Sequence, residues 1–543
     1  MSYPDPSQQP PWQPQQPGQG FPPPQQPGQG FPPPPMGPGQ PPYGGHYAAA
    51  PSPTGGGGGG RKWLIPAAAA VAVAVMAGTV WATISLAGFG GPQPESVLPG
   101  NAFAFGKVDL DIDGSQALDL LAFVDKLPDE VGDEFGEVEE DDPSGPFAET
   151  FAENYDLDQD EVEEWIGQKV GAAAWSTDHP EFSDSDGVGH AIALAVEDAG
   201  KADAQFQEIS QNHDVHHEMV DDFVVFTETS AGIEDYNDQM STHGDLESDD
   251  TYGGDVDSVP AGSIALAWAD LGALSNLEAV EEELATELGT STSMEGRMTA
   301  AFRVTGDYLQ ARMDMFGLQV DGTDLSWATE GSPAALEAMG GLPENTSVAF
   351  GGSGLDQMLR TAWEDEDLPI LDARGRQEME SSLDSIGAPL PEGFTSLLGT
   401  STAFGLADLD LGSMTSTYGA GAEPSLMFRA VGGDESALGE FVDQIVASPY
   451  SSTPTPTVGT DGDAVTVTSG SPGGGALGED EVFQQTMADL DDSVMAAFVD
   501  LRRILPRDQV EVPEQWGAVG LGMSVTEGGE RAVVELRWAP SGG

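Results

Sequence analysis

The chain contains an internal duplication, which limits the folds open to it more than any other feature. Residues 98–106, Leu-Pro-Gly-Asn-Ala-Phe-Ala-Phe-Gly, are matched by 342–351, Leu-Pro-Glu-Asn-Thr-Ser-Val-Ala-Phe-Gly, and a helical pattern follows each. Alternating strands follow acidic turns at 222–227 and 463–468, and paired-strand patterns close each copy at 299–316 and 518–538. Because the matched segments keep one order, we place two repeats of one unit at 95–330 and 331–543.

Each repeat combines short strands, several of them joined by hairpin turns, with a few helices. Such a pattern is typical of the α+β class, in which helices cover one face of a mostly antiparallel sheet. We therefore predict a duplicated α+β lobe, preceded by a disordered tail and one transmembrane helix.

The tail is residues 1–60, which consist largely of Pro, Gln and Gly and contain one acid, Asp5. This composition buries too little apolar surface to offset chain entropy, so the segment is predicted to be disordered. Its Pro-rich repeats leave a second interpretation open, a docking ligand for a protein partner that reads proline.

The transmembrane prediction rests on an uncharged run from Trp63 to Pro94. As a helix, residues 64–89 would be about 39 Å long, enough to cross a hydrocarbon core of about 30 Å. We place the span at 61–90. Arg61 and Lys62 before it predict a cytoplasmic tail and an extracellular C-terminal region at the plasma membrane. A cleaved signal peptide is the alternative, but its charged region would be unusually long.

Charge excludes some partners. The sequence has 92 acidic and 18 basic residues, a formal net charge of −74, and no cysteine. Such a surface repels nucleic acid and anionic lipid headgroups, and the chain lacks disulfides and thiolate metal sites. The acidity indicates either adaptation to external salt or carboxylates that bind a divalent cation.

Two groups of residues are candidate metal ligands. Asp109, Asp111 and Asp113, followed by Gly114, match the start of an EF-hand calcium loop, although Leu120 stands where a bidentate Glu is required. The alternative is a strand end with Asp113 capping the next helix. His213 and His217 would share one helix face and suit zinc, but they also fit an ordinary loop cluster. We predict no cofactor beyond a weakly bound divalent cation such as Ca²⁺.

Two segments resemble a known family. The first is residues 98–111, which lead into a helix, and the second, which leads into a small-residue strand, is Asp156-Leu-Asp-Gln-Asp-Glu-Val-Glu-Glu-Trp-Ile-Gly167. Both resemble an actinobacterial membrane-anchored family catalogued as domain of unknown function 3352. The Pro/Gln/Gly tail and single anchor are also similar to that family. The resemblance spans roughly residues 60–540 and implies no activity or functional residue.

The sequence lacks the common catalytic motifs. The sequence has no Gly-x-Ser-x-Gly elbow, no Ser-x-x-Lys and no phosphate-binding loop. We therefore predict no enzymatic activity. The expected function is a non-catalytic extracytoplasmic module that binds a ligand or partner or organises the envelope, with a groove between the lobes as its default site. The alternatives are an uncharacterised extracellular hydrolase and a carrier of an apolar ligand.

Overall fold

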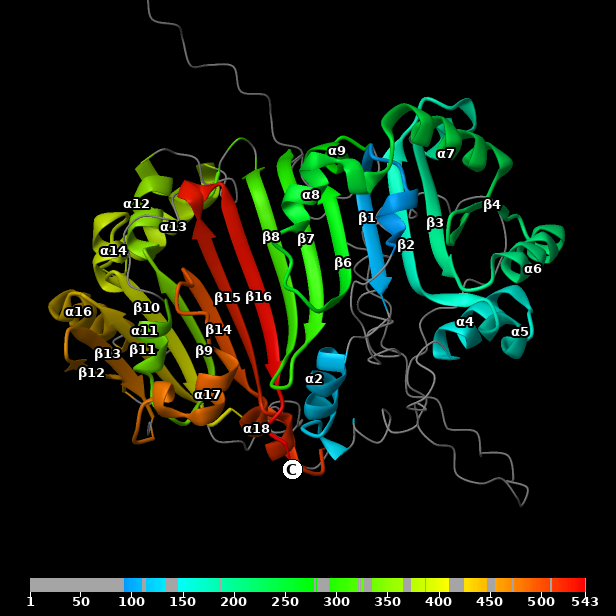
Figure 1. Cartoon of the computed structure of the whole chain (residues 1–543). Coiled ribbons are helices and arrows are strands. Elements are labelled where there is room, and N and C mark those ends of the chain that lie inside the picture. Colours follow the sequence, from blue (N-terminus) through cyan, green and yellow to red (C-terminus); the bar gives the residue numbers. More distant parts are fainter. Residues whose placement is uncertain are drawn as a thin grey trace, which may run out of the picture. The chain divides into compact units, whose positions relative to one another are not determined.

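One antiparallel sheet runs through both repeats of the computed structural model (Figure 1). The structure describes residues 92–109, 114–129, 131, 145–185, 187–277, 280, 293–320, 322, 324–326, 335–364, 373–385, 387–409, 424–446, 455–470, 473–507 and 510–542. The sheet has 16 strands in the order β12-β13-β11-β10-β9-β14-β15-β16-β8-β7-β6-β1-β2-β3-β5-β4.

The strand order in the first half of the chain is the mirror image of the order in the second. The first half contributes β1 (Ala102–Asp109), β2 (Ile166–Ser176), β3 (Val188–Val196), β4 (His216–Val220), β5 (Phe223–Thr227), β6 (Ser263–Asp270), β7 (Met294–Val304) and β8 (Leu309–Val320). The second half contributes β9 (Thr346–Ser353), β10 (Ser401–Ala407), β11 (Ser425–Val431), β12 (Thr457–Asp461), β13 (Ala464–Ser469), β14 (Met495–Asp500), β15 (Ala518–Thr526) and β16 (Arg531–Ala539). The closing strands β8 and β16 pair with each other, with Arg312 opposite Glu535.

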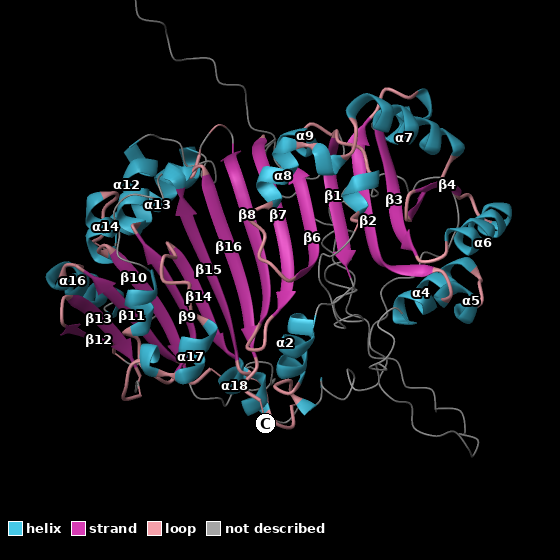
Figure 2. Cartoon of the chain, viewed as in Figure 1, coloured by secondary structure: helices cyan, strands magenta, loops and turns pink. Residues whose placement is uncertain are grey.

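Helices lie on both sides of this sheet (Figure 2). In the first half they are α2 (Gly114–Val124), α4 (Gly145–Tyr155), α5 (Gln159–Glu163), α6 (Ala199–Asn212), α7 (Ser230–His243), α8 (Asp250–Val256) and α9 (Leu271–Ser275). In the second they are α11 (Ala335–Gly340), α12 (Leu355–Glu364), α13 (Ala373–Ser385), α14 (Glu392–Leu398), α16 (Glu435–Val446), α17 (Glu481–Thr486) and α18 (Leu501–Ile504). Most are short, so their stability comes from packing against strands rather than from helix propensity.

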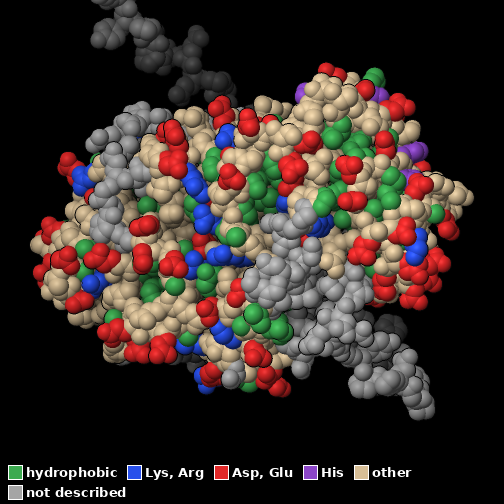
Figure 3. Space-filling view, viewed as in Figure 1, with side chains coloured by type: hydrophobic (Ala, Val, Ile, Leu, Met, Phe, Trp, Pro, Cys, Tyr) green, Lys and Arg blue, Asp and Glu red, His purple; other side chains and the backbone are tan. Residues whose placement is uncertain are grey.

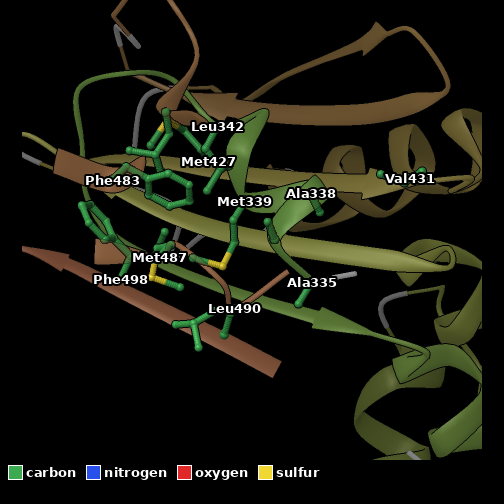
Figure 4. Packing of buried hydrophobic residues seen from close by; sticks show 14 of the residues in the cluster. Ala335, Ala338, Met339, Leu342, Met427, Val431, Phe483, Met487, Leu490 and Phe498 are labelled. Atoms are coloured by element: carbon green, nitrogen blue, oxygen red, sulfur yellow. The ribbon is translucent and has the colours of Figure 1, made fainter. Parts of the chain in front are cut away.

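One face of the sheet carries the two main cores. In the second half, Met339 of α11, Phe483 of α17 and Met487, which follows α17, pack together with Phe498 of β14 (Figure 4). In the first half, α7 and α8 cover Phe105 and Trp268. Local capping fixes these helices: Asp249 caps α8 and Asp480 caps α17, each accepting hydrogen bonds from two backbone N–H groups.

The opposite face is covered by helices at its two ends. At the first end, Phe206 of α6 packs against Leu194 and Val224, together with residues of α4 and α5. At the other end, α14 and α16 pack against Phe428 and Val465. Between these ends, α2 packs against Val304, Leu309 and Trp538. The rest of the central strands hold the surface described below.

The predicted fold class, two duplicated α+β lobes preceded by a disordered tail and one transmembrane helix, was wrong. The strands of both predicted repeats belong to one sheet, because β8 pairs with β16. Within the described ranges, no helix is long and apolar enough to cross a membrane. The predicted span at 61–90 and the predicted tail at 1–60 lie outside the described residues.

Candidate functional site

Of the first predicted metal group, Asp109, Asp111 and Asp113, the structure describes only Asp109. Asp109 lies on β1 and is fully buried. Its Oδ2 accepts a hydrogen bond from Gln93 Nε2 at 3.3 Å and lies 3.8 Å from Lys169 Nζ. Asp111 and Asp113 lie outside the described residues. Asp109 is therefore an ion-paired residue beneath the chain segment that precedes β1.

The two histidines make separate contacts. The His213 ring follows α6 and meets the Tyr155 ring edge-on at 5.4 Å. His217 lies on β4, where its Nε2 is 3.1 Å from Asp203 Oδ1 and its ring packs on Phe206. The hydrogen bond from His217 lowers the pKa of Asp203. Among the described residues, no group of three His, Asp or Glu side chains is placed to hold a metal ion. A bound divalent cation stays a prediction.

The sequence analysis missed a different surface, which we call the apolar face. Side chains alternate between the two sides of a strand, and cross-strand register shows which of them share a side. On the side opposite α11, α17, α7 and α8, six adjacent central strands place only apolar residues at these positions: Val348, Phe350, Met495, Ala497, Val499, Val519, Leu521, Met523, Val525, Ala532, Val534, Leu536, Trp538, Leu309, Ala311, Met313, Met315, Met298, Ala300, Phe302 and Val304.

The apolar face is open to solvent at several large side chains. Leu536 is 43% exposed and Phe350 37%, and Phe404 and Leu426 on the next two strands are 47% and 49% exposed. Six strands spaced about 4.8 Å apart, with seven residues rising about 3.3 Å each, give a surface of roughly 24 by 23 Å. Contiguous exposed apolar surfaces of a few hundred Å² mark interaction sites in soluble proteins.

The opposite side of the same strands, which we call the polar face, holds the charges and buries them. Asp314 is 1% exposed, Glu535 6% and Arg537 3%. Thus in β16 two buried charged residues flank a half-exposed leucine, the reverse of the usual distribution. Figure 3 shows this side, with acidic side chains spread widely and Lys and Arg gathered over the central strands.

The buried charges form an alternating ladder across β8 and β16. Asp314 accepts from Arg531 Nη2 at 2.5 Å and from Arg312 Nε at 2.8 Å. Arg312 also lies 3.8 Å from Glu535, which in turn pairs with Arg537. The hydrogen bond to Asp314 raises the pKa of Arg312. Each carboxylate thus lies between two guanidinium groups, as a buried charge requires.

A cavity of about 410 Å³ lies on the polar face at the end of this ladder. Its lining includes Arg297 and Arg531 together with Asp324, Glu527 and Glu530. Arg297 is already bound by Asp255 through two hydrogen bonds, and Arg531 by Asp314. The cavity therefore offers opposed, largely paired charges and does not select a ligand by charge.

The apolar face could have been noticed in the sequence from the alternation of apolar and polar residues along its strands. In β7, Met298, Ala300, Phe302 and Val304 alternate with Arg297, Thr299, Ala301 and Arg303. That pattern indicates a two-sided strand, and we expected its apolar side to be covered by helices. Alternation identifies the two sides but does not tell which of them other elements cover.

Comparisons with known proteins do not assign the chain to a family. No family model matches it, and no curated protein does. A solved structure, that of crystal form I of TP0453, is 8% identical over 42% of this chain and 80% of its own, with a TM-score of 0.21. A likeness this low carries no argument. The resemblance to domain of unknown function 3352 stays a prediction.

Proposed function

We propose that the chain is a non-catalytic binding module that takes an apolar ligand on the apolar face. One observation carries the proposal: in β16 the buried Glu535 and Arg537 flank Leu536, which is 43% exposed. Covering about 300 Å² of apolar surface contributes roughly 7 kcal/mol before the entropy of association is subtracted. That is enough to hold a ligand without charged contacts.

The position of the surface also supports binding. The apolar face spans the junction between β8 and β16, where both repeats contribute strands, and helices flank it at both ends. Ligand sites commonly form between repeated units and are lined mainly by apolar side chains. The alternative of a hydrolase and the extracellular location both stay predictions.

The test is binding of Nile red, an uncharged dye that fluoresces in apolar surroundings. Leu536→Glu places a charge in the middle of the apolar face, and we expect dye affinity to fall at least tenfold, because burying a leucine contributes about 2 kcal/mol. Since the side chain is half-exposed, the fold should survive the change.

Leu121→Glu is the matched control. Leu121 is 56% exposed and lies on α2, which packs against the apolar face through Phe123 and Val124 rather than through Leu121. Its dye affinity should equal that of the natural chain. Equal loss in both variants, or none in Leu536→Glu, would contradict the proposed function.

A further inference from the structure

We infer that the ligand of the apolar face is an uncharged lipid with a long acyl chain. This inference rests on the proposed function and specifies its ligand class. Three independent features of the described residues support it: the charge around the face, the side chains that compose it and its dimensions.

Charge disfavours an anionic ligand. The six-strand apolar face defined above contains no charged side chain, so an anionic headgroup over it would have no cation to pair with. The arginines of β8 and β16, Arg312, Arg531 and Arg537, lie on the other side and are engaged by Asp314 and Glu535. The whole chain, at −74, adds long-range repulsion of anions.

Methionines are concentrated where the two repeats meet. Met298 lies opposite Met315, and Met523 lies opposite Met495, with Met313 one strand beyond Val534. All five are partly exposed. Methionine is unbranched and polarisable, so Met-rich surfaces adapt to flexible ligands of variable shape. An acyl chain is such a ligand.

The dimensions suit one chain lying along the strands. The apolar face is about 23 Å long in that direction, and α2 covers the end of it at Val304, Leu309 and Trp538. The five residues from Ala532 to Leu536 on β16 lie beyond that end and span about 16 Å, whereas a single lipid leaflet is about 15 Å thick, half of a hydrocarbon core of about 30 Å. A long acyl chain therefore fits within the face. A second copy of this chain is the less favoured occupant, because two molecules of charge −74 repel each other.

The experiment compares two ligands with the same chain and different charge. At pH 8, 2-oleoylglycerol and sodium oleate are titrated against Nile red bound to the full chain. We expect 2-oleoylglycerol to displace the dye and oleate to be at least tenfold weaker. Leu536→Glu and Met313→Glu should each weaken 2-oleoylglycerol at least tenfold, and Leu121→Glu should not. Thermal unfolding of each variant identifies any that fails to fold.

The outcomes separate this inference from the proposed function. If Nile red binds in a Leu536-dependent way but neither oleoyl compound displaces it, the lipid inference is overturned and the proposed function stands. Equal displacement by oleate overturns the uncharged headgroup. A dimer in sedimentation that Leu536→Glu abolishes, without lipid binding, assigns the face to a second copy and overturns the inference. If dye binding does not depend on Leu536, both proposals fail.

Discussion

Asp314 holds two guanidinium groups in the interior of the sheet, and its neutralisation is the sharpest residue-scale perturbation. Asp314→Asn keeps the shape of the side chain but leaves Arg312 and Arg531 without their shared carboxylate. Breaking a buried pair in this way destabilises proteins by about 3–5 kcal/mol, because an uncompensated charge remains buried. We expect a loss in the free energy of unfolding in this range, measured by urea denaturation.

The control is Asp307→Asn. Asp307 pairs with Lys126 at 2.6 Å, a distance close to that of the Arg531 pair, but its side chain is 68% exposed. Exposed pairs contribute about 0–1 kcal/mol, so this change should be nearly neutral. Similar losses in both variants would show that burial does not determine the strength of the ladder.

Two buried tyrosines, Tyr252 and Tyr236, make the folded state less stable at alkaline pH. Burial, and then the Glu95 carboxylate, raise the pKa of Tyr252, whose hydroxyl donates to Glu95 Oε1 at 3.3 Å. Burial also raises the pKa of Tyr236, which donates to the Val97 carbonyl. Above pH 10 the unfolded phenols lose protons that the folded ones keep, so the unfolded state binds fewer protons and stability falls as pH rises.

We expect the free energy of unfolding to fall above pH 10 by about 1.4 kcal/mol per pH unit for each such tyrosine. Tyr252→Phe should make this slope shallower, even if stability at neutral pH is lower. Denaturation curves at pH 8 to 11 measure it. An unchanged slope in both Tyr252→Phe and Tyr236→Phe would show that these tyrosines do not cause the loss of stability at alkaline pH.

At the scale of elements, a glycine of β15 sets how closely α17 approaches the sheet. A Cβ on Gly520 would lie 2.6 Å from Met487 Sδ and 2.8 Å from Thr486 Cγ2, closer than atoms pack. Gly520→Val should therefore push the α17 region off the sheet and destabilise the fold by about 1–3 kcal/mol. The matched control is Gly459→Val on β12, whose Cβ would meet Thr466 Oγ1 at an ordinary 3.5 Å. If both variants unfold at the same denaturant concentration, the close approach has no energetic role.

The same scale shows what the sequence could and could not predict. The hairpins β7–β8 and β15–β16 could be predicted, because apolar and polar residues alternate with period two on both sides of their short turns. The pairing of β8 with β16 was not, because local periodicity carries no information about which distant strand lies next to an edge. Without that join, Arg312 and Glu535 could not be recognised as partners.

The candidate site was missed for a related reason. Asp109, His213 and His217 attracted notice because their side chains can bind metals, whereas Met313, Met523 and Leu536 look like ordinary core residues in sequence. Their role as a surface depends on an inverted sheet, in which charged residues such as Glu535 are buried and apolar ones are exposed. No pattern in a single strand distinguishes this arrangement from its opposite.

For the whole molecule, net charge determines how stability responds to salt. With 92 acidic and 18 basic residues, the compact state brings like charges closer together than the unfolded chain does. Salt shortens the screening length from about 10 Å at 0.1 M to about 3 Å at 1 M, so the repulsion weakens. We expect the melting temperature to rise from low to molar NaCl.

The ion-pair ladder should respond in the opposite sense, but only slightly, because buried pairs such as Asp314–Arg531 are screened much less than exposed charges. Asp314→Asn should therefore lower the melting temperature by a similar amount at every salt concentration, parallel to the curve of the natural chain. Calorimetry of both chains from 0.05 to 2 M NaCl measures this. A flat curve for the natural chain would show that repulsion between surface acids does not limit its stability. Converging curves would show that the ladder is open to solvent ions.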